Sequence, residues 1–306
     1  MKKKKKGNKK TYLYIAIPII VFILFYILDY IFLNVSYLKN KNVFIETFNI
    51  TGYQNGYVPQ GITYSDKYDV VLQTSYSKKN HSMLFVYNYS DGKVLKQLTI
   101  KDSNGNDSHE HVGGITTDNE HVWISNDYVL SEFSFEEILN TNEEIITSKK
   151  DLRISNKGDF CYYKDDTLWI GEFRIMGEKP LLLGFNKNDL ENPLYALEIP
   201  YLVQGMSMLE DNSIILTTSF SNLLQSKILV YSNVLEKETK EKTKIFNKEI
   251  PLYKLKKDNL IKKVKTSPMA EGIFYKDNYL HIIFENSSDE YEFTFPKIKK
   301  LVKYEI

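Results

Sequence analysis

The hydrophobic residues of this chain follow two different patterns, which change near residue 36. Between Thr11 and Val35 almost every residue is apolar, and Asp29 is the only charged one. About 23 mostly apolar residues, rising 1.5 Å each, form roughly 35 Å of helix, which is enough to cross a lipid bilayer. We therefore predict a transmembrane helix at residues 11–35.

The residues on either side of this helix predict its orientation. Residues 1–10 contain seven lysines, and such clusters of positive charge stay in the cytoplasm. A cleaved signal peptide is the alternative, but the apolar run is long for one and no small-x-small cleavage site follows it. In a cell-membrane protein of this kind we expect a cytoplasmic tail at residues 1–10, a juxtamembrane linker at residues 36–42 and an extracellular domain at residues 43–306.

Beyond the linker, apolar and polar residues alternate, which is typical of β-strands. One pattern occurs five times: a short strand, a turn containing Asp or Asn, and a second apolar strand, at residues 58–72, 111–125, 158–171, 203–216 and 270–283. Two further strand candidates follow, as at residues 83–87 and 93–100, which the turn at residues 90–92 joins. Four strands per unit are typical of a β-propeller blade.

The spacing of these units favours five blades. Their starts are separated by 53, 46, 45 and 67 residues and lie at Gly61, Gly114, Phe160, Gly205 and Gly272. A propeller blade takes roughly 40–50 residues. The predicted fold is therefore an all-β, five-bladed β-propeller preceded by one transmembrane helix, with four or six blades or a β-sandwich as alternatives.

Three details refine this prediction. Glycine near the start of an inner strand lets the backbones approach a narrow axis, and Phe160 departs from that rule. The longest interval contains a stretch rich in lysine and glutamate at residues 235–248, which we expect to be an exposed insertion. Residues 43–50 or 301–306 would supply the outer strand that closes the ring.

Charge and cysteine content narrow the function. With the seven N-terminal lysines and Asp29 set aside, 33 basic residues remain against 38 acidic ones. This balance argues against a nucleic-acid-binding or polyanion-binding face. Cys161 is the only cysteine, so no intramolecular disulfide can form. The absence of Gly-x-Ser-x-Gly, P-loop and Cys-x-x-Cys motifs leaves the common hydrolase, nucleotide and zinc-ribbon functions without support.

Polar residues recur where the inner strands begin and where the second strands end. In a propeller these positions meet around one mouth of the central channel. We therefore predict that the mouth is the ligand-binding site and contains Gln60, His111, Asn126, Asp159, Glu172, Gln204 and Glu271. The alternative is that these polar groups bind water and cap strand ends.

Two metal sites are candidates. Five carboxylates from different blades are hard oxygen ligands that suit Ca²⁺: Asp127, Asp159, Glu172, Glu271 and Glu285. Without a cation, clustered carboxylates raise one another's pKa. The weaker candidate is zinc at His109 and His111, for which the sequence supplies no third ligand at a defined spacing; His111 alone is a candidate acid or base.

Two segments resemble a known family. Pro59-Gln60-Gly61-Ile62-Thr63-Tyr64 and Ser90-Asp91-Gly92-Lys93-Val94-Leu95 resemble the first blade of the five-bladed glutaminyl cyclases of plants and bacteria. That family has a catalytic Glu in a Gly-Glu-Gly-Ile-like motif of the second blade, where this chain has Val112-Gly113-Gly114-Ile115. Of the candidate site residues, only Gln60 can be matched to this family. Glu271 cannot be matched to the catalytic Glu, because it lies in a different blade. The whole set of motifs also resembles uncharacterised bacterial propellers, secreted or membrane-anchored, which implies the fold and no activity.

These observations favour a membrane-anchored extracytoplasmic propeller that binds a ligand or protein of the cell envelope. The alternative is a propeller enzyme acting on an exported substrate, either a Ca²⁺-dependent hydrolase or lactonase or an enzyme of the glutaminyl-cyclase kind. The expected partners are the membrane, through the N-terminal helix, and a cell-envelope molecule that the sequence does not identify. No nucleic acid is expected.

Overall fold

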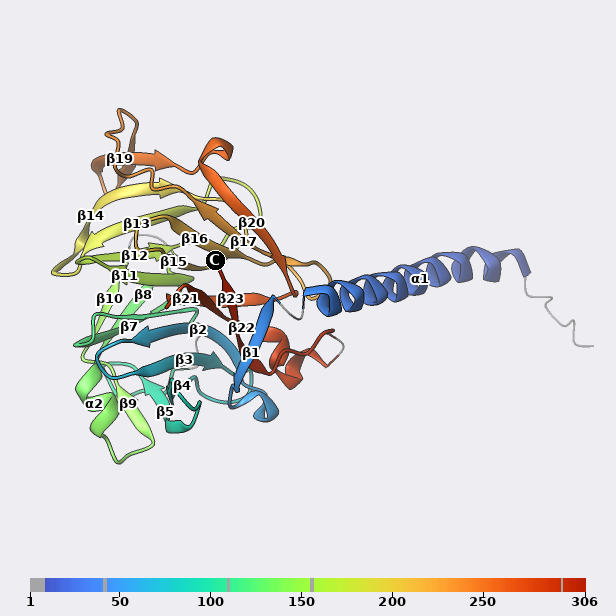
Figure 1. Cartoon of the computed structure of the whole chain (residues 1–306), viewed down its shortest axis with the longest axis horizontal. Coiled ribbons are helices and arrows are strands. Elements are labelled where there is room, and N and C mark those ends of the chain that lie inside the picture. The colour runs from blue at the N-terminus through green and yellow to red at the C-terminus, as the bar shows by residue number, and fades with distance from the viewer. Residues whose placement is uncertain (1–8, 41–42, 109–110, 155–156, 293) are drawn as a thin grey trace, which may run out of the picture.

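The computed structural model describes residues 9–40, 43–108, 111–154, 157–292 and 294–306. One long N-terminal helix, α1 (Lys9–Asn40), precedes five sheets arranged radially about an axis (Figure 1). The protein is therefore a five-bladed β-propeller with one N-terminal apolar helix. This confirms the fold predicted from the hydrophobic pattern.

Each blade contains four main antiparallel strands, counted here from the axis outwards. The inner strands are β2 (Val58–Ser65), β6 (Gly114–Thr117), β11 (Phe160–Lys164), β15 (Val203–Met208) and β21 (Ala270–Lys276). The second strands are β3 (Val70–Tyr76), β7 (His121–Asn126), β12 (Thr167–Gly171), β16 (Ile214–Thr218) and β22 (Tyr279–Phe284). The inner strands contact one another in order around the axis, and β21 contacts β2, so the ring is closed.

Two further strands complete each blade. The third strands are β4 (Met83–Asn88), β8 (Val129–Ser134), β13 (Leu181–Asn186), β17 (Ser226–Tyr231) and β23 (Lys300–Glu305). The fourth strands are β5 (Val94–Lys101), β10 (Lys150–Arg153), β14 (Asp189–Glu198), β20 (Leu260–Thr266) and β1 (Phe44–Asn49). The hairpin of β4 and β5 falls where the sequence placed it.

The fifth blade is closed by both ends of the domain. β1 pairs with β23, with Phe44 opposite Tyr304, and their rings stack with centroids 4.9 Å apart. The sequence offered either terminal segment as the closing strand, and the structure uses both. Pairing the first strand with the last removes an open sheet edge, which is the physical reason for this arrangement.

Two blades gain strands from the connection to the next blade. β9 (Ile145–Thr147) pairs in parallel with β5, and β19 (Lys248–Lys254) pairs in parallel with β14. β19 also forms a hairpin with β18 (Lys242–Ile245). The stretch expected as an exposed insertion at residues 235–248 thus contributes a hairpin that extends the third sheet.

Close approach of backbones at the axis explains the inner glycines. A Cβ on Gly272 would lie 2.7 Å from the backbone nitrogen of Ile62 in the neighbouring inner strand. Phe160, where glycine was expected, pairs with Gly171. A Cβ on Gly171 would lie 2.0 Å from the Phe160 ring, so here the glycine occupies the second strand and makes room for the aromatic side chain.

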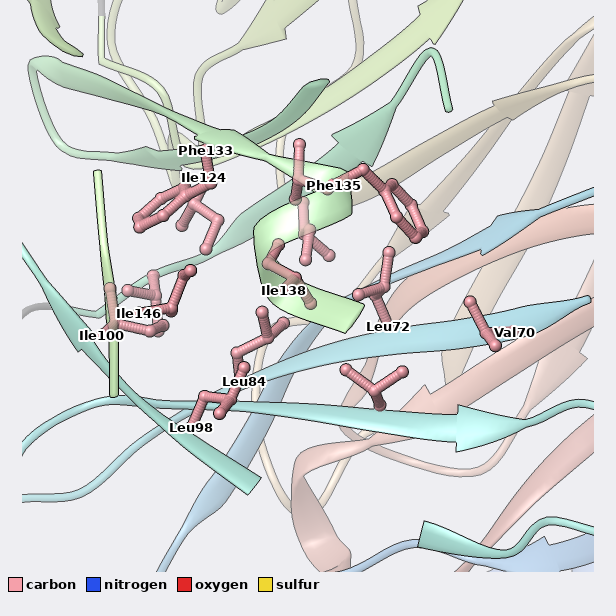
Figure 2. Packing of buried hydrophobic residues seen from close by; sticks show 14 residues of the cluster. Val70, Leu72, Leu84, Leu98, Ile100, Ile124, Phe133, Phe135, Ile138 and Ile146 are labelled. Atoms are coloured by element: carbon pink, nitrogen blue, oxygen red, sulfur yellow. The ribbon is translucent and has the colours of Figure 1, made fainter. Parts of the chain in front are cut away.

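The hydrophobic core lies between neighbouring blades. In the cluster between the first two blades, buried side chains come from facing strands and from the short helix α2 (Phe135–Asn140). Figure 2 shows Phe135 and Ile138 of α2 directed into this cluster, near Leu72 and Leu84. Such inter-blade packing fixes the blades rigidly relative to one another and so fixes the loops at the mouth.

The helix α1 contains a 26-residue stretch, Tyr14–Lys39, that is long and apolar enough to cross a membrane. It continues to Asn40, into the stretch expected as a linker at residues 36–42. Its last turns contact the propeller: Leu33 is buried, and the Tyr37 hydroxyl donates a hydrogen bond of 2.8 Å to Glu46. Figure 1 shows α1 leaving the propeller on the side where β2 begins and β3 ends.

Candidate functional site

The mouth is the end of the propeller at which the inner strands begin and the second strands end. Three inner strands have irregular pairing at this end, in β2, β15 and β21. The irregular positions contain Gln60, Gln204 and Glu271, three of the residues predicted from the sequence. Bulges of this kind redirect side chains and occur often beside binding sites.

Glu271 and Glu285 form the centre of the candidate site. Glu271 lies in β21, and Glu285 is the first residue of the 3₁₀ turn η3 (Glu285–Ser287), directly after β22. The backbone N–H of Glu285 donates to the carbonyl of Met269 at 3.0 Å, so the ends of the two strands are held together. The two carboxyl groups are close enough for each to affect the pKa of the other. Burial and like charge both disfavour ionisation of the two groups at once, so one of them retains a proton.

Neighbouring blades position this carboxyl pair. The side-chain amide of Gln60 donates to Glu285 Oε1 at 2.6 Å and to the carbonyl of Pro59 at 2.9 Å. The hydroxyl of Thr217, in the fourth blade, donates to the backbone carbonyl of Glu271 at 2.8 Å. The pair is thus supported from the first, fourth and fifth blades.

Burial controls the ionisation of the pair. Glu271 is 4% exposed, and burial together with the negative charge of Glu285 raises its pKa well above the usual value. Glu285 retains some exposure, but its carboxyl is largely enclosed by protein, and this raises its pKa to about 7. We assign the proton to Glu271, which is the more deeply buried of the two and whose Oε1 has no hydrogen-bond partner. At neutral pH the pair therefore carries at least one proton.

Two tyrosines lie beside the pair. Tyr76, at the end of β3, and Tyr291, in the 3₁₀ turn η4 (Asp289–Tyr291), have hydroxyl oxygens 3.4 Å apart. Burial and the charges of the two glutamates raise the pKa of both tyrosines, so both are neutral hydrogen-bond donors. The Tyr76 ring contacts the ring of His111, with centroids 4.5 Å apart.

A lysine organises the neighbouring part of the mouth. The Lys157 ammonium lies 2.9 Å from Asp127 and 3.2 Å from Asp159. Although burial alone would lower the pKa of Lys157, these two carboxylates raise it. Desolvation of the ring and the positive charge of Lys157 lower the pKa of His111, so the imidazole is neutral at pH 7. The backbone N–H of His111 donates to Asn126 Oδ1 at 3.1 Å.

The remaining predicted residues lie in the third and fourth blades. Glu172 accepts two hydrogen bonds from the guanidinium of Arg174, at 2.9 and 3.1 Å. Gln204 lies at the irregular start of β15 and is half-buried. The mouth therefore contains three separate groups: the Glu271–Glu285 pair with Gln60, the Lys157 cluster, and the Glu172–Arg174 ion pair. His109 lies outside the described residues.

Corresponding positions in two blades have different electrostatics. Asp159 and Glu172 flank the first hairpin of the third blade much as Glu271 and Glu285 flank that of the fifth. In the third blade, Lys157 and Arg174 neutralise the two carboxylates. Among the described residues, no lysine or arginine forms an ion pair with Glu271 or Glu285. The buried pair in the fifth blade therefore retains a proton instead of pairing with a cation.

Sequence reasoning missed four residues of the mouth. Tyr76 and Tyr291 flank the carboxyl pair, while Lys157 and Arg174 neutralise the acidic residues of the third blade. Tyr76 could have been found from its place at the end of a second strand, which is the same signal that found Asn126. Tyr291 lies in an irregular loop and follows no pattern in the sequence.

The Ca²⁺ expected at the mouth remains a prediction. Asp127 and Asp159 bind Lys157 and Glu172 binds Arg174, so an ion bound by these carboxylates would have to displace both cations. Among the described residues, Asp118, Glu120 and His121 have potential ligand atoms within 4.8 Å of one another. This acidic group lies in the turn between β6 and β7, at the opposite end of the propeller. Lys187 already pairs with Asp118 there, at 3.0 Å.

Comparisons with known proteins establish the fold alone. No protein-family model matches the chain, and no curated protein matches it in sequence. The crystal structure of glutaminyl cyclase from Myxococcus xanthus is similar with a TM-score of 0.50 and 8% identity, covering 84% of this chain and 94% of that one. The PQQ-bound aldose sugar dehydrogenase from Streptomyces coelicolor is similar with a TM-score of 0.50 and 10% identity, covering 86% and 97%. The resemblance to glutaminyl cyclases is thus confirmed for the propeller fold.

Proposed function

We propose that this protein is a membrane-anchored, extracytoplasmic β-propeller that binds a small cell-envelope ligand at its mouth through Glu271 and Glu285. The observation that carries the proposal is the buried carboxyl pair, in which Glu271 Oε1 is left without a hydrogen-bond partner. An unsatisfied buried oxygen costs free energy, roughly 1–3 kcal/mol, which a ligand that donates a hydrogen bond would recover. The ligand therefore carries a hydroxyl, amide or amine group.

The groups around the pair fit such a ligand. The Tyr76 and Tyr291 hydroxyls can donate to acceptor atoms beside the donor group that meets Glu271. Gln60 holds Glu285 in place, so little side-chain entropy is lost on binding. Sugars and peptides combine donors and acceptors in this way, and both occur in cell envelopes.

Anchoring in the membrane is the second part of the proposal. It is supported by the length and apolar character of the stretch Tyr14–Lys39 in α1 and by the seven lysines at residues 1–10. Because lysine clusters remain in the cytoplasm, the propeller would be exported. The domain boundaries expected from the sequence form part of this proposal.

The binding site can be tested with the full-length protein in phospholipid nanodiscs. Isothermal titration with a panel of monosaccharides, amino-acid amides and short peptides would identify a ligand, and titration in buffers of different ionisation enthalpy would count the protons released or taken up. We expect Glu285→Gln to weaken binding at least tenfold and to abolish proton exchange. Glu178→Gln is the matched control, because Glu178 is on the same side of the propeller and its side chain is 91% exposed. Equal affinities for wild type and Glu285→Gln would refute the assignment.

An acid–base enzyme is the second candidate, favoured by one specific observation. Glu271 holds a proton while the pKa of Glu285, near 7, allows it to accept one at physiological pH. A protonated and an ionisable carboxyl side by side can act as general acid and general base in hydrolysis. Turnover of an ester, a lactone or an N-terminal glutaminyl peptide, lost in Glu271→Gln and retained in Glu178→Gln, would establish this activity. No turnover of any substrate class would leave the binding function.

A further inference from the structure

The membrane helix is fixed against the mouth side of the propeller. The Tyr30 ring of α1 lies 4.9 Å from the ring of Phe295, in the loop between β22 and β23. One turn later, Leu33 is 4% exposed and shares a small pocket with Pro268 and Ile298. These contacts fall three residues apart, on one face of the helix. The propeller is therefore held by a defined contact, and the direction of α1 sets its orientation.

A second contact extends this attachment to the fourth blade. The side-chain amide of Gln225 donates a hydrogen bond to the hydroxyl of Ser36, one turn beyond Leu33. Gln225 ends the loop between β16 and β17, which lies at the mouth. Loops of both the fourth and the fifth blade therefore touch the end of α1.

The position of these contacts along α1 gives their depth relative to the membrane. Tyr30 lies five residues before the end of the apolar run at Val35, which is roughly 7.5 Å along a helix. A hydrocarbon core about 30 Å thick takes up about 20 of the apolar residues. Phe295, in contact with Tyr30, consequently lies at the level of the outer membrane interface, and the mouth-side loops lie near it.

The mouth-side loops carry exposed apolar side chains. Ile175 is 53% exposed and Met176 is 78% exposed in the loop between β12 and β13. Phe220 is 52% exposed and Leu224 is 55% exposed in the loop between β16 and β17. The second of these loops is the one that Gln225 joins to α1. These loops belong to two different blades, and their exposed apolar side chains are of the kind that insert into a membrane interface.

The inner turns at the opposite end of the propeller have a different composition. The five turns that join inner strands to second strands lie there, at residues 66–69, 118–120, 165–166, 209–213 and 277–278. Together they contain nine acidic residues and one lysine, and none of the large exposed apolar side chains lies in them. An acidic surface avoids the negative surface of a phospholipid membrane. The five turns nearest the axis at this end are therefore acidic, whereas the mouth-side loops described above carry exposed apolar side chains.

We infer that the mouth side of the propeller rests on the bilayer that α1 crosses, with Ile175, Met176, Phe220 and Leu224 inserted into the interface. The occupant of this apolar surface is the phospholipid bilayer itself. The inference rests on the proposed function in one respect, the membrane anchoring by α1. Its consequence for the site is that a ligand reaches Glu271 and Glu285 along the membrane surface, as a lipid headgroup or a molecule tethered to lipid.

The test measures the depth of single labels in the full-length protein. Met176→Cys and Leu224→Cys would be labelled with a fluorescent bimane in nanodiscs of phosphatidylcholine and phosphatidylglycerol, with and without brominated acyl chains. Cys161 is buried and does not compete for the label. The matched controls are Phe246→Cys, a 61% exposed apolar residue in the turn between β18 and β19, and Asp277→Cys at the acidic end.

We expect brominated lipid to quench the labels at positions 176 and 224 several-fold more than those at positions 246 and 277. Equal quenching at all four positions would overturn the inference. The ligand titration of wild type and Glu285→Gln is scored separately. Strong quenching at the mouth with no Glu285-dependent binding would refute the binding function and support the bilayer contact. Glu285-dependent binding without quenching would refute the bilayer contact alone.

Discussion

The carboxyl pair makes a quantitative prediction about stability and pH. Burial raises the pKa of Glu285 to about 7, against an ordinary value of 4.5. The folded protein therefore binds more protons than the unfolded chain between these two pH values, and its stability falls as the pH rises through this window. A difference of 2.5 pKa units corresponds to about 3 kcal/mol. This loss of stability is absent below pH 4.5 and complete above pH 7. The pKa of Glu271 is also raised, so Glu271 likewise destabilises the folded protein as the pH rises.

Glu285→Gln isolates this effect. Glutamine is nearly isosteric and does not ionise, so the variant and the wild type should have similar stability at pH 4.5. At pH 8 the variant should be more stable by about 3 kcal/mol, which for a domain of this size raises the melting temperature by roughly 6 °C. Differential scanning fluorimetry from pH 4.5 to pH 8.5, in one detergent, measures this difference.

An exposed glutamate on the mouth side of the propeller provides the control for Glu285→Gln. Glu178→Gln removes an exposed carboxylate of the same side of the propeller and should follow the wild-type curve at every pH. Other titrating groups, including Asp159 and His111, contribute equally to wild type and variant and cancel in the difference. Melting temperatures for Glu285→Gln and wild type that differ by a constant amount across the pH range would show that Glu285 is not buried as an acid.

Three further predictions follow from the ring and the mouth. Gly272→Ala places a Cβ 2.7 Å from a backbone nitrogen and 2.8 Å from a backbone oxygen of β2, so it should cost roughly 1–3 kcal/mol or more in urea unfolding. Lys157→Met leaves Asp127 and Asp159 without their cation and should lower the melting temperature at pH 7, an effect of about 1 kcal/mol that disappears once both acids are protonated. Deleting residues 43–50 removes β1 and exposes the edge of β23, so size-exclusion chromatography should show association into oligomers; a stable monomer would contradict the role of β1 in closure.

Much of the architecture was predictable because its signals are local. The apolar run of residues 11–35 is a property of consecutive residues, and strand alternation and Asp or Asn turns are properties of short windows. Five units at similar spacing were enough to predict the propeller. The polar positions at the mouth followed from the same register: Gln60, Gln204 and Glu271 all lie at the irregular starts of inner strands.

The chemistry of the mouth was decided by contacts between distant segments. Glu172 and Glu285 follow their strands in the same way, yet Arg174 neutralises the first while Glu271 and Gln60 hold the second. Gln60 and Glu285 are 225 residues apart in sequence and meet only because the ring closes. Electrostatic interactions depend on the distances and burial that packing creates, and those are set by the whole fold.

The sequence by itself determined the elements of this protein: an apolar helix long enough to span a membrane, strands of period two, and polar residues at the strand ends. Only the tertiary structure decided which carboxyl groups are buried without a cation and which pair with lysine or arginine. It also set the helix against the mouth, through Leu33 and Ser36. The physical reason is the range of each effect. The alternation of side chains along a strand and the length of an apolar helix depend on residues close together in sequence. Desolvation and charge pairing act between groups that are distant in sequence and that the closed ring brings together.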